Sequence, residues 1–446
     1  MQKESEVIDM RKHKMYIAAI TLAVCMMATA CGGSSGSSDS LSSNNNNETV
    51  SSSDSSSNTN SSDGNNSSST GNSSSENTSG SSSSSNSSGI LDTSDIFSNR
   101  DLEQTADVSD AETINIADGQ IIDITTEGVY LISGSAKNCT IRVAADTQDK
   151  VQLVLDGVNI TNDDFPAIYV VSADKCFITT TGSDNTLSVT GTFTSDGDTN
   201  TDAVIFSKDD LVLNGTGTLE INSTSGNGIS AKDDMKITGG TYTITSAKDS
   251  IEANDSISIC GGTFNITSSK DALHCENDDD NTLGWIYISD GTFNITATSD
   301  GIQGTTVVQI DGGTFHIISS EGIEATYVQI NGGTIYIEAS DDGINASANT
   351  SIYDVVIEIN GGDITVVMGQ GDTDAIDANG SIYVNGGTID ITATMSSFDY
   401  DRTAEFNGGT IIINGEEVSE IPAGMMGGGF GDKGGDFNGG GNHGKR

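Results

Sequence analysis

The chain has 446 residues, a formal net charge of −46, 53 glycines and only 2 prolines. This negative charge argues against binding to a nucleic-acid backbone, and contact with an anionic polymer would need intervening cations. Aromatic residues make up only 5% of the chain, with a single Trp, which argues against a wide aromatic platform for sugars.

The amino terminus has the pattern of an export signal. Basic residues at 11–14 precede an apolar run at 15–27 that is short for a membrane span, and small residues precede Cys31. We expect residues 1–30 to be a signal peptide and Cys31 to be lipidated; cleavage of an ordinary signal peptide near Ala30 is the alternative. The mature protein would be extracytoplasmic, at the surface of a Gram-positive bacterium, with the lipid as its sole contact with the membrane.

Residues 31–95 are rich in Ser, Asn and Gly and have almost no apolar side chains. Such a segment cannot bury enough surface to fold, so it predicts a disordered linker. Residues 96–210 are strand-rich but irregular, as in "KVQLVLDGVNIT" and "AIYVVSADKCFITT", and predict the first coils and a cap. The glycine-rich residues 416–446 predict a disordered tail.

Four cysteines lie beyond the amino-terminal segment: Cys139, Cys176, Cys260 and Cys275. None has the CxxC spacing of a zinc site. In an exported protein these residues are either paired in disulfides, such as Cys139 with Cys176, or buried free thiols. The sequence leaves both open.

Residues 211–415 repeat one motif, seen in "GGTFNITSSKDALHC" (261–275) and "DGTFNITATSDGIQG" (290–304). Its turn threonine recurs about every 20–25 residues, and the apolar residues around the turn alternate with polar ones. Alternation of period two marks short strands with one buried face. Such strands bury a core only when successive coils stack, so the sequence predicts an all-β fold, a parallel β-helix of about a dozen coils. The paired glycines suit turns that need positive φ.

Two polar series follow the turns. The first contains Asp249, Asp271, Asp300, Glu321 and Asp342, and three residues further on lies the second, which contains Glu252 and Glu324. Equivalent positions stack in a β-helix, so carboxylates would lie about 5 Å apart and repel each other by about 1–3 kcal/mol per pair. Calcium, which takes oxygen ligands from several side chains, removes that repulsion. The candidate calcium ligands are Asp249, Glu252, Asp271, Glu276, Asp300, Glu321, Glu324, Asp342, Asp374 and Asp377. The alternative is that each Asp only accepts hydrogen bonds from nearby backbone.

These motifs, over residues 112–415, resemble a family of secreted clostridial lipoproteins with carbohydrate-binding domains. The resemblance implies a right-handed parallel β-helix related to pectate lyases, with bound calcium. It also implies binding to cellulose or to acidic sugars such as polygalacturonate. His274 and Gln303 depart from the pattern, because an acidic residue would be the better ligand there.

The function we expect is non-catalytic binding of polysaccharide at the cell surface by a monomer, with calcium bridging to uronate carboxylates. Outward side chains beside the strands would contact the glycan; the candidates are Asn265, Tyr287, Asn294, His316, Tyr336 and Tyr383. The first alternative is a calcium-dependent pectate-type lyase, with Lys248 or Lys270 as the base. Because neighbouring residues of a strand point to opposite faces, we expect each Lys to point away from the Asp that follows it. The second alternative is a structural or adhesive surface protein.

Overall fold

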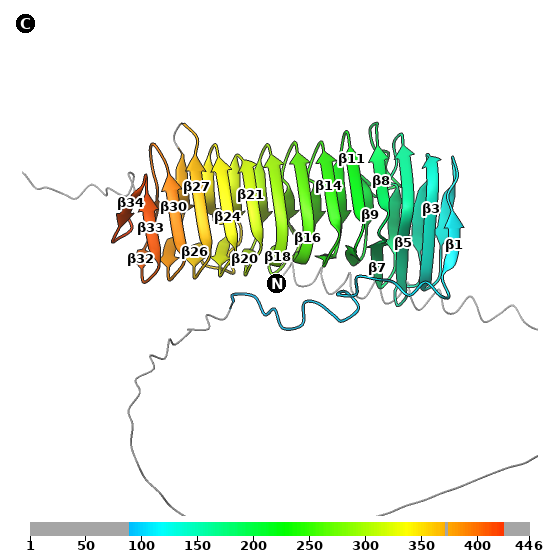
Figure 1. The fold of residues 1–446 in the computed structure, drawn as a ribbon, viewed down its shortest axis with the longest axis horizontal. Helices are drawn as coiled ribbons and strands as arrows, with labels where there is room; N and C mark the ends of the chain where they lie inside the picture. Colours follow the sequence, from blue (N-terminus) through cyan, green and yellow to red (C-terminus); the bar gives the residue numbers. More distant parts are fainter. Residues whose placement is uncertain (1–88, 371–372, 423–446) are drawn as a thin grey trace, which may run out of the picture. The chain divides into compact units, whose positions relative to one another are not determined.

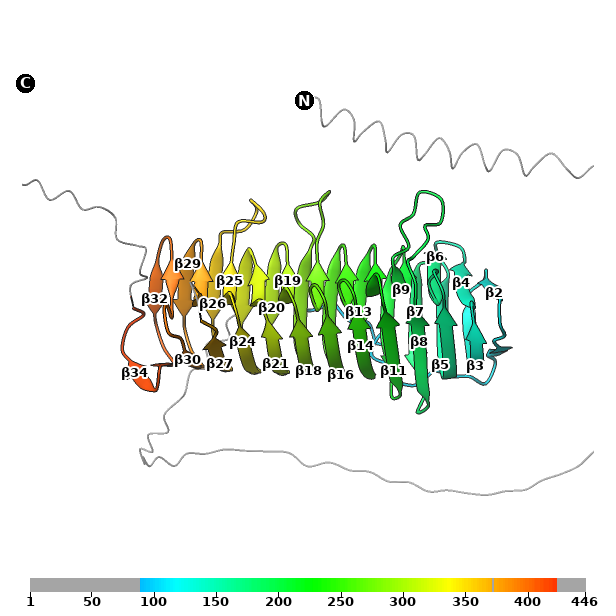
Figure 2. The same ribbon diagram turned by 90° about the horizontal axis from the view of Figure 1, so that it is seen from above.

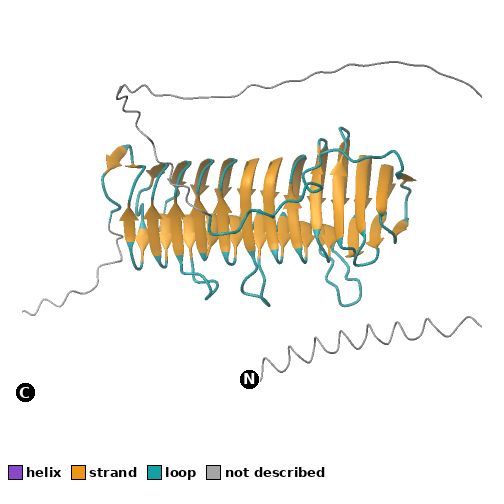
Figure 3. Ribbon diagram, turned by 90° about the horizontal axis from the view of Figure 1, so that it is seen from below, coloured by secondary structure: helices purple, strands orange, loops and turns teal. Residues whose placement is uncertain are grey.

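The computed structural model describes residues 89–370 and 373–422, and within them the strands stack as a parallel β-helix (Figure 1). Each regular coil contributes a strand to a first row, turns at a glycine pair into a second row, and then enters a twelve-stranded sheet. Twelve strands in that sheet confirm the prediction of a β-helix of about a dozen coils. Among the described residues no segment is helical (Figure 3).

The two rows belong to one 22-stranded sheet because β3, β5, β16 and β18 run through both. The first row consists of β1 (Glu112–Asn115), β3 (Gly128–Lys137), β5 (Lys150–Asn162), β7 (Lys175–Thr180), β10 (Leu211–Gly215), β13 (Asp234–Ile237), β16 (Ser256–Ser268), β18 (Trp285–Ala297), β20 (Val307–Ile310), β23 (Tyr327–Ile330), β26 (Val356–Ile359), β29 (Ser381–Val384) and β32 (Ala404–Phe406). The second row adds β8 (Asp184–Val189), β11 (Thr218–Ser223), β14 (Thr241–Ser246), β21 (Thr314–Ser319), β24 (Thr334–Ala339), β27 (Asp363–Met368), β30 (Thr388–Thr392), β33 (Thr410–Ile413) and the antiparallel β34 (Glu416–Val418).

The twelve-stranded sheet positions the candidate site. Its strands are β2 (Ile121–Ile124), β4 (Thr140–Ala144), β6 (Ile168–Ser172), β9 (Ala203–Ser207), β12 (Asn227–Ala231), β15 (Ile251–Ala253), β17 (Leu273–Cys275), β19 (Asp300–Gly304), β22 (Glu321–Ala325), β25 (Asp342–Ala346), β28 (Asp374–Ala378) and β31 (Asp399–Tyr400). Long loops at 276–284 and 347–355 project from the carboxyl ends of β17 and β25 (Figure 2).

The core consists of inward side chains that stack from coil to coil. Phe264, Phe293 and Phe315 lie directly above one another, with ring centroids 4.7 and 4.6 Å apart and nearly parallel planes. These rings and the aliphatic columns around them are almost fully buried. Because each aromatic side chain buries a large apolar area, this stack stabilises the packing of these coils on one another.

The turns explain the repeated glycines. The second glycine of each pair has positive φ, for example 111° at Gly262 and 105° at Gly313, as predicted. At the corner where the chain passes from the second row into the twelve-stranded sheet, a Cβ on Gly322 would lie 2.3 Å from the carbonyl oxygen of Gly343 in the following coil. Only glycine fits there.

Residues 89–111 precede the first strand and lie along the first row, in the direction opposite to the order of the coils (Figure 1). Backbone N–H groups of Ile90 and Leu91 donate to the side chains of Gln329 and Gln309, both at 2.9 Å. The predicted linker boundary at residue 95 is therefore too late, because amide side chains of the first row hold the backbone from residue 90 onward.

The predicted tail boundary at residue 416 is too early, because β34 pairs with β33 and extends the sheet to residue 418. Cys139, Cys176, Cys260 and Cys275 are all free, which favours the thiol alternative over disulfides. The predicted signal peptide, Cys31 and most of the predicted linker lie outside the described residues, as does the tail beyond residue 422.

Candidate cation and glycan site

The two polar series stack as columns along the twelve-stranded sheet. In the first column Asp300 pairs with Glu321, and Asp342 pairs with Asp374. In the second column the pairing runs through Glu252, His274, Gln303, Glu324, Asn345, Asp377 and Asp399. The predicted vertical alignment of the carboxylates is therefore present.

The first column also stabilises the backbone at the corners. Oδ1 of Asp249 accepts the N–H of Asp271 at 3.1 Å, and Oδ1 of Asp271 accepts the N–H of Asp300 at 3.0 Å. Asp342 accepts from Asp374 in the same way, at 3.2 Å. One oxygen of each of these carboxylates thus accepts a hydrogen bond from nearby backbone, as the alternative to calcium binding predicts. The other oxygen can bind a second partner.

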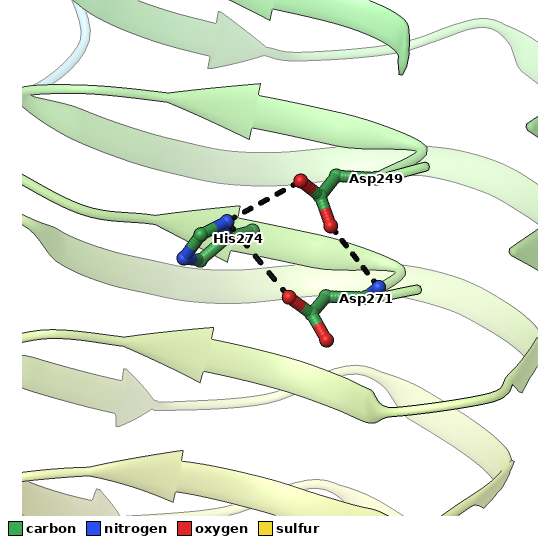
Figure 4. A group of neighbouring side chains, drawn as sticks. All are labelled: Asp249, Asp271 and His274. Carbon is green, nitrogen blue, oxygen red and sulfur yellow. Dashed lines mark hydrogen bonds and ion pairs between the residues drawn. The ribbon is translucent and has the colours of Figure 1, made fainter. Parts of the chain in front are cut away.

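At Asp249 and Asp271 that second partner is already present (Figure 4). Nζ of Lys270 lies 3.1 Å from Oδ2 of Asp249 and 3.3 Å from Oδ2 of Asp271. Nδ1 of His274 lies 3.5 and 3.8 Å from the same two oxygens. The expectation that Lys270 points away from Asp271 is wrong, because Lys270 lies in the corner between β16 and β17, where strand alternation does not apply.

The pKa values of this group follow from its pairing. Burial alone would raise the pKa of Asp249, but the interactions with His274 and the charge of Lys270 outweigh it and lower that pKa to about 2. Burial likewise opposes charge on Lys270 and His274, and the adjacent carboxylates raise both pKa values. The two carboxylates therefore stabilise positive charge on both neighbouring groups.

Further along the columns the carboxylates lack such partners. Among the described residues, no Lys, Arg or His forms an ion pair with Asp300, Glu321, Glu324, Asp342 or Asp377. Burial, followed by the charges of Asp271, Glu321 and Glu324, raises the pKa of Asp300 to about 8.

The pKa values of other carboxyl groups that follow Asp300 along the columns are also raised. Burial is the main cause at each residue, and neighbouring carboxylates add to it. The pKa rises to about 7 at Glu321 and Asp377 and to about 6 at Asp342. This stretch of the columns is therefore a row of carboxyl groups, buried at Asp300 and partly buried beyond it, in which ionisation is unfavourable because no cationic side chain among the described residues pairs with them.

These contrasts decide which part of the columns fits calcium. Asp249, Asp271 and His274 bring three ligand atoms within 4.8 Å of one another, but one is a nitrogen and Lys270 already balances the charge. Calcium prefers oxygen ligands, so this group fits it poorly. The part from Asp300 to Asp377 offers carboxylate oxygens, and it also contains Oδ1 of Asn345, a buried atom with no hydrogen-bond partner. That part fits a hard cation in donor type, but among the described residues the groups with three ligand atoms within 4.8 Å of one another are Asp249–Asp271–His274 and Asp210–Asp233–Asp234, so a cation there would draw its oxygens from successive coils.

A groove lies beside the boundary between these two parts. It has a volume of about 610 Å³ and runs between the loops 276–284 and 347–355. Lys270, His274 and Glu276 line one side, and Asp300 and Gln303 line the other. Nε2 of His274 is 3.6 Å from the exposed carboxylate of Glu276. The groove is open and predominantly polar, as a site for a hydrated glycan would be.

The residues predicted to contact a glycan do not share one surface. Asn265, Asn294, His316 and Tyr336 align on the outer face of the second row. Tyr383 lies on the first row, next to Glu358. The prediction for Tyr287 is wrong, because its side chain is 7% exposed and its hydroxyl donates to Asp311 at 3.0 Å.

The sequence reasoning missed a second group of carboxylates. Asp210, Asp233 and Asp234 bring oxygens within 4.8 Å of one another at the amino ends of the first-row strands β10 and β13. Burial is the main cause that raises the pKa of Asp233, to about 6. The paired "DD" at 209–210 and 233–234, one coil apart, is the signal that could have found it.

Comparison with known proteins identifies the family. A family model described as carbohydrate-binding domain-containing protein matches residues 118–375, more than half of the chain. The chain belongs to this family. A carbohydrate-binding domain-containing protein from Acetivibrio thermocellus is 39% identical over 126 residues, which cover 28% of this chain and 44% of that relative. The chain thus spans less than half of that relative's length.

Among solved structures, a polysaccharide lyase-like protein from C. thermocellum, determined as a gadolinium derivative, is 23% identical. The match covers 71% of this chain and 98% of that chain, with a TM-score of 0.39. Within the residues that the structure describes, we find no helix that is long and apolar enough to cross a membrane.

Proposed function

We propose that this carbohydrate-binding family member binds acidic polysaccharide without cleaving it, and that calcium held by the columns from Asp300 to Asp377 bridges to uronate carboxylates. The proposal depends on the alignment of carboxylates from Asp300 to Asp377 in successive coils, where no cationic side chain among the described residues pairs with them. The raised pKa values of Asp300, Glu321 and Asp377 support it. Bound calcium would supply that balance and leave coordination positions for an acidic sugar.

The groove beside Asp300 supports this assignment of the glycan. Lys270 lines it with a side chain that is 48% exposed, so its ammonium can also reach a uronate carboxylate. A chain lying between loops 276–284 and 347–355 would pass over both the paired and the unpaired parts of the columns. Calcium would hold it at one end and Lys270 at the other.

Catalysis by the lysines proposed for a lyase is disfavoured by their surroundings. A general base has to be deprotonated near neutral pH, but the two adjacent carboxylates raise the pKa of Lys270. Nζ of Lys248 forms an ion pair with Asp202 at 2.6 Å. We therefore expect no unsaturated uronate to appear when the protein is incubated with polygalacturonate and calcium.

The test is retention of full-length protein on immobilised polygalacturonate, with calcium and with EDTA. We expect retention in calcium, loss of retention in EDTA, and loss in Glu321→Gln/Glu324→Gln even when calcium is present. Glu338→Gln is the matched control, because Glu338 is exposed on the second row. Equal retention of all three proteins in EDTA would rule out bridging by calcium, and retention of none in calcium would favour a structural or adhesive role.

Surface localisation is part of the proposal. We propose that lipid on Cys31 anchors the protein outside the cytoplasm, with the residues up to 88 as a spacer. Radiolabelled fatty acid should enter the wild-type protein in cells and should not enter Cys31→Ala. Labelling of both proteins, or of neither, would contradict the anchor.

A further inference from the structure

Residues 89–111, which we call the strap, are held against the first row around Asp101. The guanidinium of Arg100 lies 4.5 Å from the centre of the Phe177 ring, which is a cation–π contact. The backbone carbonyl of Asp101 accepts a hydrogen bond from Oγ1 of Thr238 at 2.5 Å. Oε1 of Gln104 accepts the N–H of Gly215 at 2.9 Å. These contacts fix the side chain of Asp101 beside β7 and β10.

The carboxyl group of Asp101 is enclosed next to an amine. Nζ of Lys175 lies 3.7 Å from Oδ1 of Asp101, and the two side chains are 14% and 1% exposed. Oδ2 of Asp101 accepts the N–H of Ser98 at 2.8 Å. Within the part of the chain that the structure describes, Oδ1 has no hydrogen-bond partner, because Lys175 is too distant to donate one. A buried carboxylate oxygen without a donor is costly, so the ion pair leaves this group unsatisfied.

A second carboxyl group lies beside the same amine. Oδ2 of Asp210 is 3.4 Å from Nζ of Lys175, and the side chain of Asp210 is 25% exposed. Burial raises the pKa of Asp210 against the charge of Lys175, and the charges of Asp233 and Asp234 add to the rise. A carboxyl group with a raised pKa can both accept and return a proton. The amine therefore has one carboxyl group to react with and another to move its protons.

We propose that Nζ of Lys175 and Cγ of Asp101 join in an isopeptide bond, which ties the strap covalently to β7. Burial favours the neutral amine and the neutral carboxyl group, which are the forms that react. The fixed strap holds the two groups together, so the reaction occurs within one molecule and needs no encounter in water. The amide product has no charge to bury, and its formation removes Oδ1, the oxygen without a partner.

The bond forms with loss of one water, and Asp210 acts as general base and then as general acid. Lys175 passes one proton to Oδ1 of Asp101, and its neutral nitrogen attacks Cγ. The N–H of Ser98 stabilises the negative charge that develops on Oδ2. The nitrogen gives a second proton to the carboxylate of Asp210, which passes it to Oδ1. The bond between Cγ and Oδ1 breaks, Oδ1 leaves as water, and the third proton stays on the amide nitrogen.

Lys150 and Asp174 form an exposed pair of the same residue types and serve as a comparison. Their side chains are 44% and 38% exposed, so water solvates both charges and the neutral forms are not favoured. In the described ranges, no second carboxyl group forms an ion pair with Lys150. We expect no covalent bond between these two residues.

The isopeptide bond closes residues 101–175 into a loop that contains the first coils of the β-helix. A pull on the amino-terminal side of the strap then reaches β7 directly, without first opening the coil at β1. That consequence rests on the lipid anchor proposed at Cys31, whereas the bond itself does not.

The test is mass spectrometry of the full-length protein after digestion with trypsin. We expect peptides 101–137 and 151–208 to be joined, with the mass of one water missing, because trypsin does not cleave after a bonded Lys175. Lys175→Arg keeps the positive charge, but its guanidinium does not lose a proton and is no nucleophile, so peptide 101–137 should be released unjoined.

The role of Asp210 is tested by the rate of joining after a pulse of isotopically labelled amino acids. We expect joining to be at least about tenfold slower in Asp210→Asn, because the general acid and base is removed. Asp209→Asn is the matched control. It changes the adjacent carboxyl group, which forms no ion pair with Lys175 among the described residues, and it should join at the rate of wild type.

The proposal is overturned if wild-type protein yields only the separate peptides 101–137 and 151–175, since Lys175 and Asp101 are then an ion pair and nothing more. A bond between Lys150 and Asp174 would contradict the argument from burial. Equal rates of joining in Asp210→Asn and Asp209→Asn would exclude Asp210 as the acid and base. Thermal unfolding followed by the fluorescence of the single Trp checks that every variant is folded, and the wild-type digest decides the proposal without any variant.

Discussion

Replacing Asp300 by Asn should stabilise the protein when calcium is absent. Asp300 is 5% exposed, and burial with the charges of Asp271, Glu321 and Glu324 raises its pKa to about 8. In the unfolded chain the pKa of an Asp carboxyl is about 3.9, so this carboxyl is ionised at pH 7. Folding must protonate it, and the free-energy cost corresponds to the difference of about three units between pH 7 and that pKa. At about 1.4 kcal/mol per unit this costs up to about 4 kcal/mol, and Asn does not incur it.

The sign of the effect depends on pH. A pKa that is higher in the folded state than in the unfolded state contributes stability below about pH 4, and that contribution is lost as the pH rises toward 8. In EDTA, Asp300→Asn should therefore be about 2–4 kcal/mol more stable than wild type at pH 7 and equal to it at pH 4. Saturating calcium should reduce the difference at pH 7, because the metal stabilises only the ionised wild-type site.

The assay is urea unfolding of the full-length protein at both pH values, followed by Trp fluorescence. Glu338→Gln removes one carboxylate from an exposed position and should change the free energy of unfolding by less than about 0.5 kcal/mol. If Asp300→Asn is no more stable than wild type at pH 7, or is stabilised equally at pH 4, the carboxyl of Asp300 does not have a raised pKa in the folded protein.

Three further changes test the account by urea unfolding. Lys270→Gln leaves the buried carboxylates of Asp249 and Asp271 without their ammonium partner and should lower the free energy of unfolding by about 1–3 kcal/mol at pH 7; an unchanged midpoint would contradict the pairing. Phe293→Ala interrupts the ring stack and should cost about 3–5 kcal/mol, so a loss below about 1 kcal/mol would mean that the stack contributes little. Gly322→Ala should cost about 1–3 kcal/mol or more through its clash with the next coil, whereas Gly182→Ala, where nothing lies within 4 Å, should be nearly neutral; equal effects would count against the clash.

The fold was predictable because each coil repeats the same local pattern. The glycine pair, the alternating strand and the Asp-Gly corner recur with nearly constant spacing, and stacking follows from the need to bury one face of each strand. The segment 89–111 was not predictable in the same way. It has no periodicity, and it is held by single contacts such as Leu91 with Gln309, which join residues more than 200 positions apart.

The sequence predicted where the carboxylates of the candidate site lie, but it did not predict which of them pair with a cationic side chain. Alignment of Asp300 with Glu321 follows directly from the repeat. The pairing of Lys270 with Asp249 depends on how a corner turns between two strands, which alternation along a strand does not describe. Alternation places Tyr287 correctly on the outside of β18, but it does not reveal that the side chain is covered, because its hydroxyl donates to Asp311 and the non-periodic residues 89–111 lie along the first row.

The most direct measurement of the central claim is calcium anomalous scattering from crystals of the protein grown with calcium. We expect a peak between coils, within bonding distance of oxygens from Glu321, Glu324 or Asn345, and no peak between Asp249 and Asp271, where the ammonium of Lys270 already pairs with both carboxylates. A map with no peak along the columns from Asp300 to Asp377, or with its peak at Asp249 and Asp271, would contradict it.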